Sequence, residues 1–407
     1  MTVWIANPFD SLPLEGNRPQ RYWLLARAFA RAGHDVTLWT SDFSHARKAR
    51  RAFPGADAAA RTVVRRGEVW PCGETPGFRV ALVRTPAYRR NVGLARVWSH
   101  RAFARRWRAW TAEEAPPDVL VTSLPPLALG AAVRRAARTL WVVDVMDAWP
   151  ETFERLVPRA LLAPLRRVAR RIYRRADAVA GVAERYVALA RAYGATCPMR
   201  VFHHGIARAG GAPEAPAPSA SRCRLVYAGN MGASYDLATV VEAVKGMEDV
   251  ALDLAGSGPD EAALRARAAG CPRIRFHGYL GDVALRDLLA GGDAALVPLF
   301  DASCVGVPYK LADYAAAGLP VLNTLHGETE RLLAAHGAGL TYRAGDAAAF
   351  RDALARLRAR DAAALRAGAR RLAATFDADA VYPAYVAWVE GLAAGKRKTE
   401  KEEGGRA

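Results

Sequence analysis

The chain has 407 residues, enough for two domains that each build a core of their own. A hydrophobic fraction of 52% and a charged fraction of 24% exclude a disordered protein, and no apolar run approaches the roughly 18 residues that cross a bilayer. The N-terminus, MTVWIANPF, enters structure without a basic leader, and the five cysteines lack the spacing of metal ligands, so we expect a cytoplasmic protein.

Short apolar strands alternate with amphipathic helices through the first half of the chain. The expected strands are 3–7, 35–41, 79–84, 118–123 and 140–146, and the expected helices are 22–33, 126–138 and 159–176. The apolar stretches 176–183 and 199–205 complete this half. Repeated strand, helix and strand units predict a parallel sheet covered by helices on both faces.

A segment rich in Pro, Gly and Ala, 208–221, reads as a linker, after which the alternation restarts. The expected strands are now 224–229, 250–256, 273–278, 294–299 and 320–324, and the helices are 236–246, 259–269, 283–290, 309–317 and 327–335. The predicted fold class is therefore α/β, with Rossmann-like domains at 1–207 and 222–377 whose parallel sheets face a central cleft. A last helix, 378–395, is expected to cross back onto the first domain, and 396–407 to form a disordered tail.

The positive charge is concentrated in the first half. Residues 1–207 hold 34 Lys and Arg against 16 Asp and Glu, and the remainder holds 24 of each. Arginines interleaved with aromatic residues between Arg84 and Arg108, and with aliphatic residues between Arg155 and Arg175, suit a helix on an anionic membrane surface. The expected membrane or acceptor face comprises Arg89, Arg90, Trp98, Arg101, Arg105, Arg106, Trp107 and Arg108. The alternative is a solvated helix face, and no nucleic-acid-binding motif accompanies the charge, so we expect no nucleic acid partner.

The segment VGVPYKLADYAAAGLPVL places Lys310 and Asp313 three residues apart in a helical stretch, so both side chains share one face. Lysine can meet a diphosphate and the carboxylate can accept from ribose hydroxyls, which indicates a nucleotide site. The alternative is a surface ion pair.

Glycines mark further approaches for a ligand where strands pass into helices. The candidate donor-binding residues in these turns are Gly16, Asn17, Arg18, Gly229, Asn230, Gly256, Gly258 and Gly278. A steric need for glycine explains each of them equally well.

The second half resembles the donor domain of family 4 glycosyltransferases, through YAGNMG, LAGSGPDEAALRARA, RFHGYLGDVALRDLLAGGDAALVPL and VPYKLADYAAAGLPVL. In the first half, DVMDAWPETF is similar to a segment of a bacterial subgroup that builds surface polysaccharides and lipopolysaccharide. The resemblance implies the GT-B fold and transfer from a nucleotide sugar, expected to be a UDP- or GDP-sugar, with retention of anomeric configuration. It departs from the family pattern at Val305, which replaces a carboxylate, at Asn230, which replaces an arginine, and at Met146, which replaces a histidine.

The residues assigned to catalysis are Asp147 and Lys310. Asp147 is either a polar group at the cleft or a helix N-cap, and Glu328 either contacts the sugar or caps its helix. The Asp-x-Asp triplet of the chain, Asp377 to Asp379, stands at the start of the expected last helix and outside the candidate donor turns. We expect no cofactor and no obligatory metal, with Lys310, Arg18 and helix-terminus amides stabilising the leaving diphosphate. His203 and His204 are expected to have a structural role between the domains, with catalysis as the alternative.

The expected function is transfer of a sugar to a lipid-linked or glycan acceptor in cell-surface polysaccharide or lipopolysaccharide biosynthesis. The enzyme would act at the inner face of the cytoplasmic membrane as a peripheral protein on anionic lipid. The alternatives are a soluble GT-B transferase with a small-molecule acceptor and a catalytically silent scaffold that binds a glycan or a partner.

Overall fold

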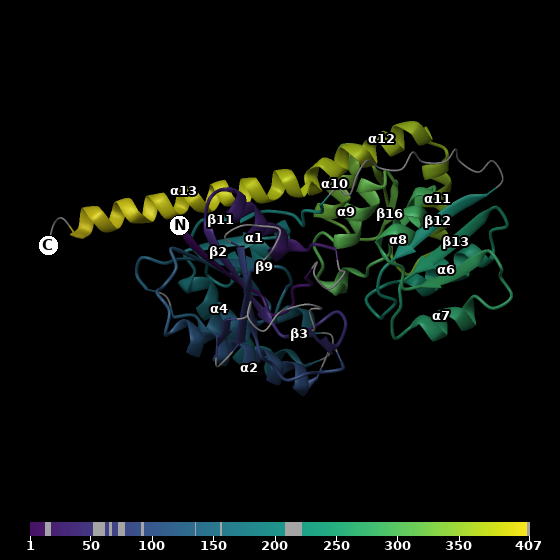
Figure 1. Ribbon diagram of the computed structural model, residues 1–407. Coiled ribbons are helices and arrows are strands. Elements are labelled where there is room, and N and C mark those ends of the chain that lie inside the picture. The colour runs from purple at the N-terminus through teal and green to yellow at the C-terminus, as the bar shows by residue number, and fades with distance from the viewer. Residues whose placement is uncertain are drawn as a thin grey trace. The chain divides into compact units, whose positions relative to one another are not determined.

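A computed structural model describes residues 1–12, 18–51, 62–64, 67–71, 78–90, 93–134, 136–154, 157–207 and 222–404 (Figure 1). The chain forms two compact units. Unit 1 contains Met1–Ala207 together with Ala378–Ala407, and unit 2 contains Arg208–Asp377. The last helix therefore returns to the unit in which the chain began.

Unit 1 is built on a sheet with the strand order β11-β10-β9-β8-β1-β2-β7-β6-β5. The strands from β11 to β7 are parallel, and β6 and β5 add antiparallel pairs at one edge. Their bounds are β1 (Thr2–Ala6), β2 (Asp35–Ser41), β5 (Thr62–Val64), β6 (Gly67–Pro71), β7 (Phe78–Val83), β8 (Val119–Leu124), β9 (Leu140–Val145), β10 (Ala178–Gly181) and β11 (Met199–Val201). Strands β8, β9 and β10 are buried along their whole length, as expected for strands covered on both faces.

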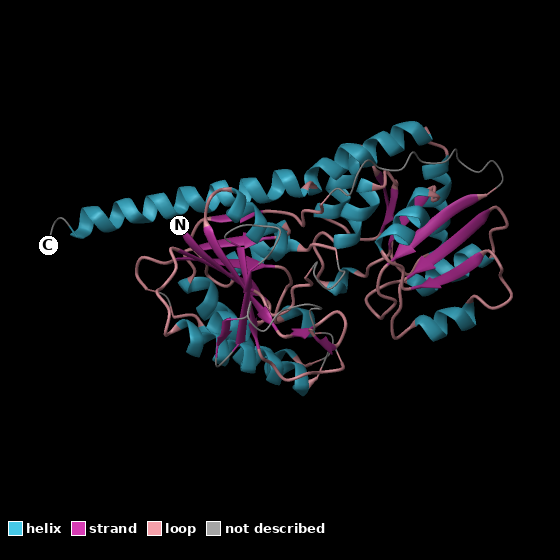
Figure 2. Ribbon diagram, in the orientation of Figure 1, coloured by secondary structure: helices cyan, strands magenta, loops and turns pink. Residues whose placement is uncertain are grey.

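Helices pack around this sheet (Figure 2). They are α1 (Arg21–Arg31), α2 (Leu94–Thr111), α3 (Leu127–Ala132), α4 (Ala163–Arg175) and α5 (Glu184–Ala192), with 3-10 turns at Glu151–Phe153 and Arg159–Leu162. A short hairpin, β3 (Phe43–Ser44) and β4 (Ala49–Arg50), follows β2. Helix α3 is shorter than the predicted 126–138, because the backbone leaves the helical conformation at Val133, whose side chain is buried.

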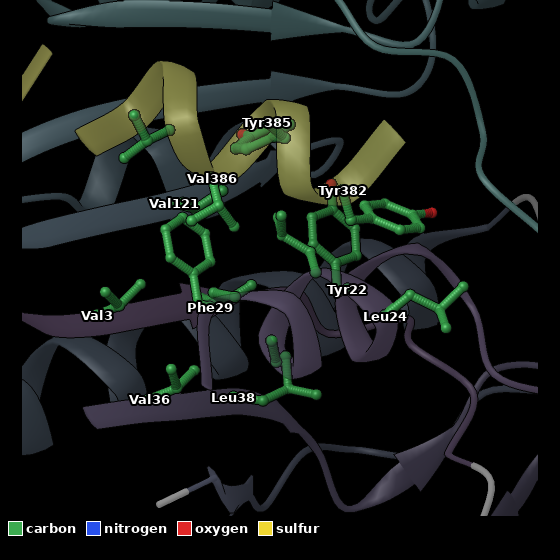
Figure 3. Close-up of a cluster of buried hydrophobic side chains, with 14 of the residues drawn as sticks. Val3, Tyr22, Leu24, Phe29, Val36, Leu38, Val121, Tyr382, Tyr385 and Val386 are labelled. Atoms are coloured by element: carbon green, nitrogen blue, oxygen red, sulfur yellow. The ribbon is translucent and has the colours of Figure 1, made fainter. Parts of the chain in front are cut away.

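Helix α13 (Ala378–Gly404) packs its apolar face on α1. Figure 3 shows Tyr382, Tyr385 and Val386 of α13 above Tyr22 and Phe29 of α1, and all five side chains are buried. The helix continues well beyond residue 395, so it includes most of the segment that the sequence analysis assigned to a disordered tail. Lys396 holds this part, since its Nζ donates to the Thr139 carbonyl at 2.8 Å and lies 3.1 Å from Asp177 Oδ2.

A buried ion pair joins α1 to β9. Arg21 donates from Nε and an Nη to Asp144, with a shortest distance of 3.0 Å, and both side chains are at most 1% exposed. The other Nη donates to the carbonyls of Phe202 and His203. The described contacts of His203 lie inside unit 1, where its ring also bonds the Val182 carbonyl at 3.2 Å. The predicted inter-domain role of this histidine stays a prediction.

Unit 2 contains a parallel sheet with the order β14-β13-β12-β15-β16-β17. Its strands are β12 (Cys223–Ala228), β13 (Val250–Ala255), β14 (Ile274–Gly278), β15 (Ala294–Val297), β16 (Val321–Asn323) and β17 (Gly339–Thr341). Its helices are α6 (Leu237–Lys245), α7 (Glu261–Arg267), α8 (Asp282–Ala290), α9 (Tyr309–Ala316), α10 (Glu328–His336), α11 (Ala347–Arg358) and α12 (Ala362–Ala373). The chain builds outward from β12 to β14 and then returns to the other side at β15. Open α/β sheets bind ligands beside such a switch point, outside the carboxyl ends of the strands.

Candidate functional site

The turns after β12 and β13 pack against each other at this switch point. The Gly229 N–H donates to the Ala255 carbonyl, and the Met231 N–H donates to the Ser257 carbonyl, both at 3.0 Å. A Cβ at Gly256 would lie 2.0 Å from the Gly229 carbonyl oxygen, and one at Gly258 would lie 2.1 Å from that of Met231. Loop packing alone thus requires glycine at both positions, whether or not a ligand binds.

Gly229 is different because its missing side chain makes room for a charge. It has a φ of +145°, and a Cβ here would lie 2.9 Å from Lys310 Nζ. The glycine therefore lets the lysine ammonium approach the backbone at the end of β12.

A pocket of about 440 Å³ opens beside these turns in unit 2. It is lined by Ala228, Gly229, Asn230, Tyr235, Ala255, Gly256, Ser257, Tyr279, Leu280, Leu285, Tyr309, Lys310 and Asp313. Its volume suits a small organic ligand, and its lining combines apolar surface with a few polar groups. Among the donor-site residues predicted for unit 2, the pocket brings together Gly229, Asn230, Gly256, Lys310 and Asp313.

Lys310 has the most unusual environment in this lining. Its Nζ lies 3.9 Å from the ring centroid of Tyr227 and 4.1 Å from that of Tyr235. Although the side chain is only half-buried, the ammonium nitrogen is buried and has no hydrogen-bond partner among the described residues. Burial lowers the pKa of Lys310 well below its ordinary value of 10.5. An anion in the pocket would supply the partner that the ammonium lacks.

Helix α9 is held in place by Tyr314, whose hydroxyl accepts from the Ala228 N–H at 2.8 Å. This bond fastens the helix to the end of β12 and so positions Lys310 beside Gly229. Asp313 lies one turn along α9, is half-buried and lines the same pocket. The predicted sharing of one face by lysine and carboxylate agrees with this placement.

Three predicted residues of unit 2 lie outside this lining, namely Gly258, which packs against Met231, and Gly278 and Glu328. Gly278 ends β14 with a φ of +65°, and its carbonyl accepts from the Gly256 N–H at 2.6 Å, so it supports the turn. Glu328 begins α10, where its neighbour Thr329 donates to the Gly306 carbonyl at 2.8 Å. Glu328 therefore stands next to the loop that leads into α9.

The remaining candidates lie in unit 1. Asp147 follows β9, and its Oδ1 accepts from the Ala148 N–H at 2.8 Å and from the Thr152 hydroxyl at 3.1 Å. Burial raises the pKa of Asp147, against the effect of these bonds. Arg18 lies half-buried before α1, and Gly16 and Asn17 lie outside the described residues.

The basic face predicted on α2 divides along the helix. Trp98 is 63% exposed and Leu94 is 88% exposed, whereas Trp107 is only 3% exposed. The prediction for Trp107 is wrong, because it shares a helical face with the buried Phe103 and Trp110. Of the predicted arginines, Arg108 is half-buried and Arg89, Arg90, Arg101, Arg105 and Arg106 are exposed.

Two kinds of feature are absent from the described part of the chain. No group of three His, Cys, Asp or Glu side chains there is placed to hold a metal ion. No helix in that part is both long enough and apolar enough to cross a membrane.

Two families match the chain, one for each unit. The family described as "Glycosyl transferase 4-like domain" matches residues 20–205, and the one described as "Glycosyl transferases group 1" matches residues 222–360. The chain belongs to the glycosyltransferases. No curated protein sequence matches it.

Solved structures show that this glycosyltransferase has the GT-B fold, as predicted. Sucrose-phosphate synthase from Thermosynechococcus elongatus matches with a TM-score of 0.73 and 17% identity, covering 97% of this chain and 100% of that one. WaaG, a glycosyltransferase involved in lipopolysaccharide biosynthesis, matches with a TM-score of 0.64 and 15% identity, covering 95% and 98%. HepE from Anabaena, in complex with UDP and glucose, matches with a TM-score of 0.62 and 12% identity, covering 96% and 100%.

The two aromatic rings around Lys310 were not predicted from the sequence. Tyr227 is the last residue but one of β12 and Tyr235 precedes α6, so neither shares a local pattern with Lys310 in α9. Their position was the available signal, since Tyr227 lies near the end of the first strand of the domain and Tyr235 lies in the turn that follows this strand.

Proposed function

We propose that the protein transfers a sugar from a UDP- or GDP-sugar to a lipid-linked or glycan acceptor, with retention of configuration. The pathway would be the biosynthesis of cell-surface polysaccharide or lipopolysaccharide. Retention and the pathway are proposed from the resemblance to family 4 glycosyltransferases and from the likeness to WaaG.

The observation that carries the donor proposal is the buried ammonium of Lys310 beside the Gly229 turn. A diphosphate placed there would receive a charge-assisted hydrogen bond from Nζ and would meet backbone amides of the turn. The solved complexes of HepE with UDP and of a starch synthase with ADP support a nucleotide ligand for this fold.

Each candidate residue has a distinct role in the proposed reaction. Lys310 would offset the negative charge that develops on the leaving diphosphate, with Arg18 assisting and without an obligatory metal ion. Asp313 would accept from the ribose hydroxyls, and Glu328 would contact the sugar. Asp147 would orient the acceptor hydroxyl that attacks from the face that the diphosphate leaves.

A calorimetric screen against UDP-, GDP-, dTDP- and CMP-sugars, with and without magnesium, tests the donor proposal. We expect the nucleotide sugar with one of these bases to bind clearly, and we expect magnesium to leave its affinity unchanged. A folded protein that binds no member of the panel would instead support the silent scaffold.

We also propose that unit 1 acts as a peripheral membrane surface at the cytoplasmic face. Arg101, Arg105 and Arg108 wall a groove of about 460 Å³ that is otherwise lined by alanines of α2 and α3. None of these three arginines has a carboxylate partner among the described side chains. Anionic headgroups would supply the missing charge, and the exposed Leu94 and Trp98 would enter the interface.

Flotation with vesicles of phosphatidylglycerol and phosphatidylcholine separates this proposal from a soluble transferase that acts on a small molecule. The second candidate has support from the likeness to sucrose-phosphate synthase. We expect Arg101→Gln combined with Arg105→Gln and Arg108→Gln to reduce flotation, while Arg185→Gln on α5 serves as the control. Equal flotation of parent and triple variant at low salt would favour the soluble transferase.

A further inference from the structure

One face of α2 carries a continuous row of side chains at intervals of four and three residues. Side chains with this spacing lie on the same face of a helix. Phe103, Trp107 and Trp110 have such a spacing on the opposite face and are buried. The row therefore points away from the core of unit 1, and it consists of Leu94, Trp98, Arg101, Arg105 and Arg108.

The arginines of this row wall a groove between α2 and α3. The groove has a volume of about 460 Å³, and Arg101, Arg105 and Arg108 are the charged residues of its lining. All its other lining residues are alanines, whose side chains end at Cβ and so leave space between the two helices. The alanines are Ala104, Ala109 and Ala112 of α2 and Ala128, Ala131 and Ala132 of α3. The groove therefore offers room for a bound group beside three guanidinium groups.

The charge of these arginines is not offset within the described structure. Helix α2 contains five arginines and no acidic residue, and α3, which packs against it, contains no charged residue. The nearest acids along the chain, Glu113 and Glu114, follow α2 and do not line the groove. Arg101, Arg105 and Arg108 have no hydrogen-bond or ion-pair partner among the described side chains. Like charges four residues apart destabilise a helix, so a bound anion would remove a repulsion present in the free protein.

The three arginines are spread along the groove. Arg108 follows Arg101 by seven residues, which corresponds to about 10 Å along the helix axis. One phosphate is too short to contact guanidinium groups over this whole length, whereas two phosphates joined by a short linker match it. A guanidinium group can donate two parallel hydrogen bonds to each phosphate. The spacing therefore favours a headgroup with two phosphates over a headgroup with one.

The same row of α2 continues into exposed apolar surface. Trp98 comes three residues before Arg101, and Leu94 lies one further turn toward the start of the helix. Both side chains are largely exposed, although both are large and apolar. Apolar and aromatic side chains beside arginines suit a helix that lies at the boundary between lipid headgroups and acyl chains. A lipid whose headgroup meets the arginines would therefore have its acyl chains on the side of Leu94 and Trp98.

We propose that the groove between α2 and α3 binds the headgroup of one anionic membrane lipid that carries two phosphate groups. Arg101 would hold one phosphate and Arg108 the other, with Arg105 between them, and the linker of the headgroup would lie over the alanines. Leu94 and Trp98 would enter the bilayer beside the acyl chains. This inference rests on the proposed membrane surface of unit 1 and names the class of lipid that this surface recognises.

Flotation of the full chain with two kinds of phosphatidylcholine vesicle tests the inference. One kind contains phosphatidylglycerol and the other half as much cardiolipin, so that both surfaces have the same density of negative charge. We expect binding to the cardiolipin vesicles to be about five-fold tighter or more, since only cardiolipin presents paired phosphates. Arg105→Lys keeps the charge but not the paired hydrogen bonds, and Ala131→Leu fills the groove, so both should reduce this preference. Ala188→Leu, at an exposed alanine of α5, is the matched control.

Three results would overturn the inference. Equal binding to both kinds of vesicle would show that unit 1 responds to charge density alone, and the proposed membrane surface would stand without a lipid site. A cardiolipin preference that is unchanged in both Arg105→Lys and Ala131→Leu would place the recognition outside this groove. Binding to neither kind of vesicle would refute the membrane surface and the lipid site together, while calorimetry with nucleotide sugars remains the separate test of the transferase proposal.

Discussion

Replacing Lys310 by methionine should separate the stability of the free protein from its affinity for the donor. Methionine has a similar length and can pack between Tyr227 and Tyr235 through favourable sulfur–aromatic contacts. The substitution removes a buried ammonium that has no hydrogen-bond partner in the described structure. In the parent, the two cation–π contacts of Lys310 contribute about 0.5 to 2 kcal/mol, and the cost of burying its charge offsets this contribution. We therefore expect the free variant to be at least as stable as the parent.

The affinity for the donor should change in the opposite direction. A charge-assisted hydrogen bond to diphosphate contributes about 1.5 to 3 kcal/mol. Its loss corresponds to a donor Kd that rises by about ten-fold to somewhat more than a hundred-fold. Lys245→Met, which removes an exposed lysine from α6 of the same unit, should leave the Kd unchanged.

Proton linkage gives this prediction a second measurement. Because the folded-state pKa of Lys310 lies below the unfolded value, the unfolded chain holds a proton that the folded chain lacks at pH values between the two. The stability of the free parent should therefore rise with pH in this window, by at most about 1.4 kcal/mol per pH unit from this group. Binding of a diphosphate raises the pKa again and should draw in up to one proton.

Calorimetry of donor binding in two buffers with different ionisation enthalpies measures this uptake directly. At pH values between the folded-state and unfolded-state pKa of Lys310, we expect a buffer-dependent enthalpy for the parent and for Lys245→Met, and a smaller buffer dependence for Lys310→Met. Equal buffer dependence in all three proteins, or an unchanged Kd in Lys310→Met, would refute the assignment of Lys310 to the diphosphate.

Four other expectations can be checked with single changes or conditions. Gly256→Ala should destabilise unit 2 by about 1 to 3 kcal/mol in urea unfolding, because its Cβ would meet a carbonyl, whereas Gly270→Ala, also at positive φ but with open space, should cost less. Asp144→Asn should lower the free energy of unfolding by about 3 to 5 kcal/mol, since it leaves the Arg21 charge buried without its partner; a loss under about 1 kcal/mol would contradict this account. Asp147→Asn should lower turnover with little change in Tm, and a large drop in Tm at normal specific activity would make it a structural cap. Raising salt from 50 to 300 mM should reduce liposome flotation strongly and donor affinity only slightly, since exposed charges are screened more than buried ones.

Local patterns predicted most of the secondary structure because the strands are mainly apolar and the helices are amphipathic. LWVVDV in β9 and VALDLA in β13 are such strands. The spacing of Lys310 and Asp313 also places both in one pocket, because residues three apart share a face of any helix. These features depend on neighbours in the chain, and a single sequence contains that information.

Two predictions were wrong because they relied on local composition. Helical periodicity decides which side chains are buried, and helix propensity decides where a helix ends. Trp107 was assigned to the basic face because arginines surround it, although its spacing from Phe103 and Trp110 places it inward. The segment KRKTEKEE was assigned to a tail because it lacks apolar residues, yet it is rich in strong helix formers that continue α13 to Gly404.

Other features could not be predicted because they join distant parts of the chain. Tyr227 and Tyr235 come together with Lys310 only when α9 returns to the end of β12. His45, between β3 and β4, likewise comes close to the charge of Arg96 in α2 only in the folded chain. A histidine that is not part of a recognisable sequence motif does not indicate which residues it contacts in the fold.

The two units also differ in how they can attract an anion. Unit 1 holds 39 Lys and Arg against 21 Asp and Glu, whereas unit 2 holds 19 of each, so unit 1 carries the whole net charge of +18. A surface with such an excess attracts anionic lipid over a distance set by the salt concentration. Unit 2 has no excess charge to attract a nucleotide sugar, so its selectivity must come from groups inside the pocket. Lys310 suits that task, because an ammonium buried between two rings interacts strongly with a bound diphosphate and contributes little to the field outside.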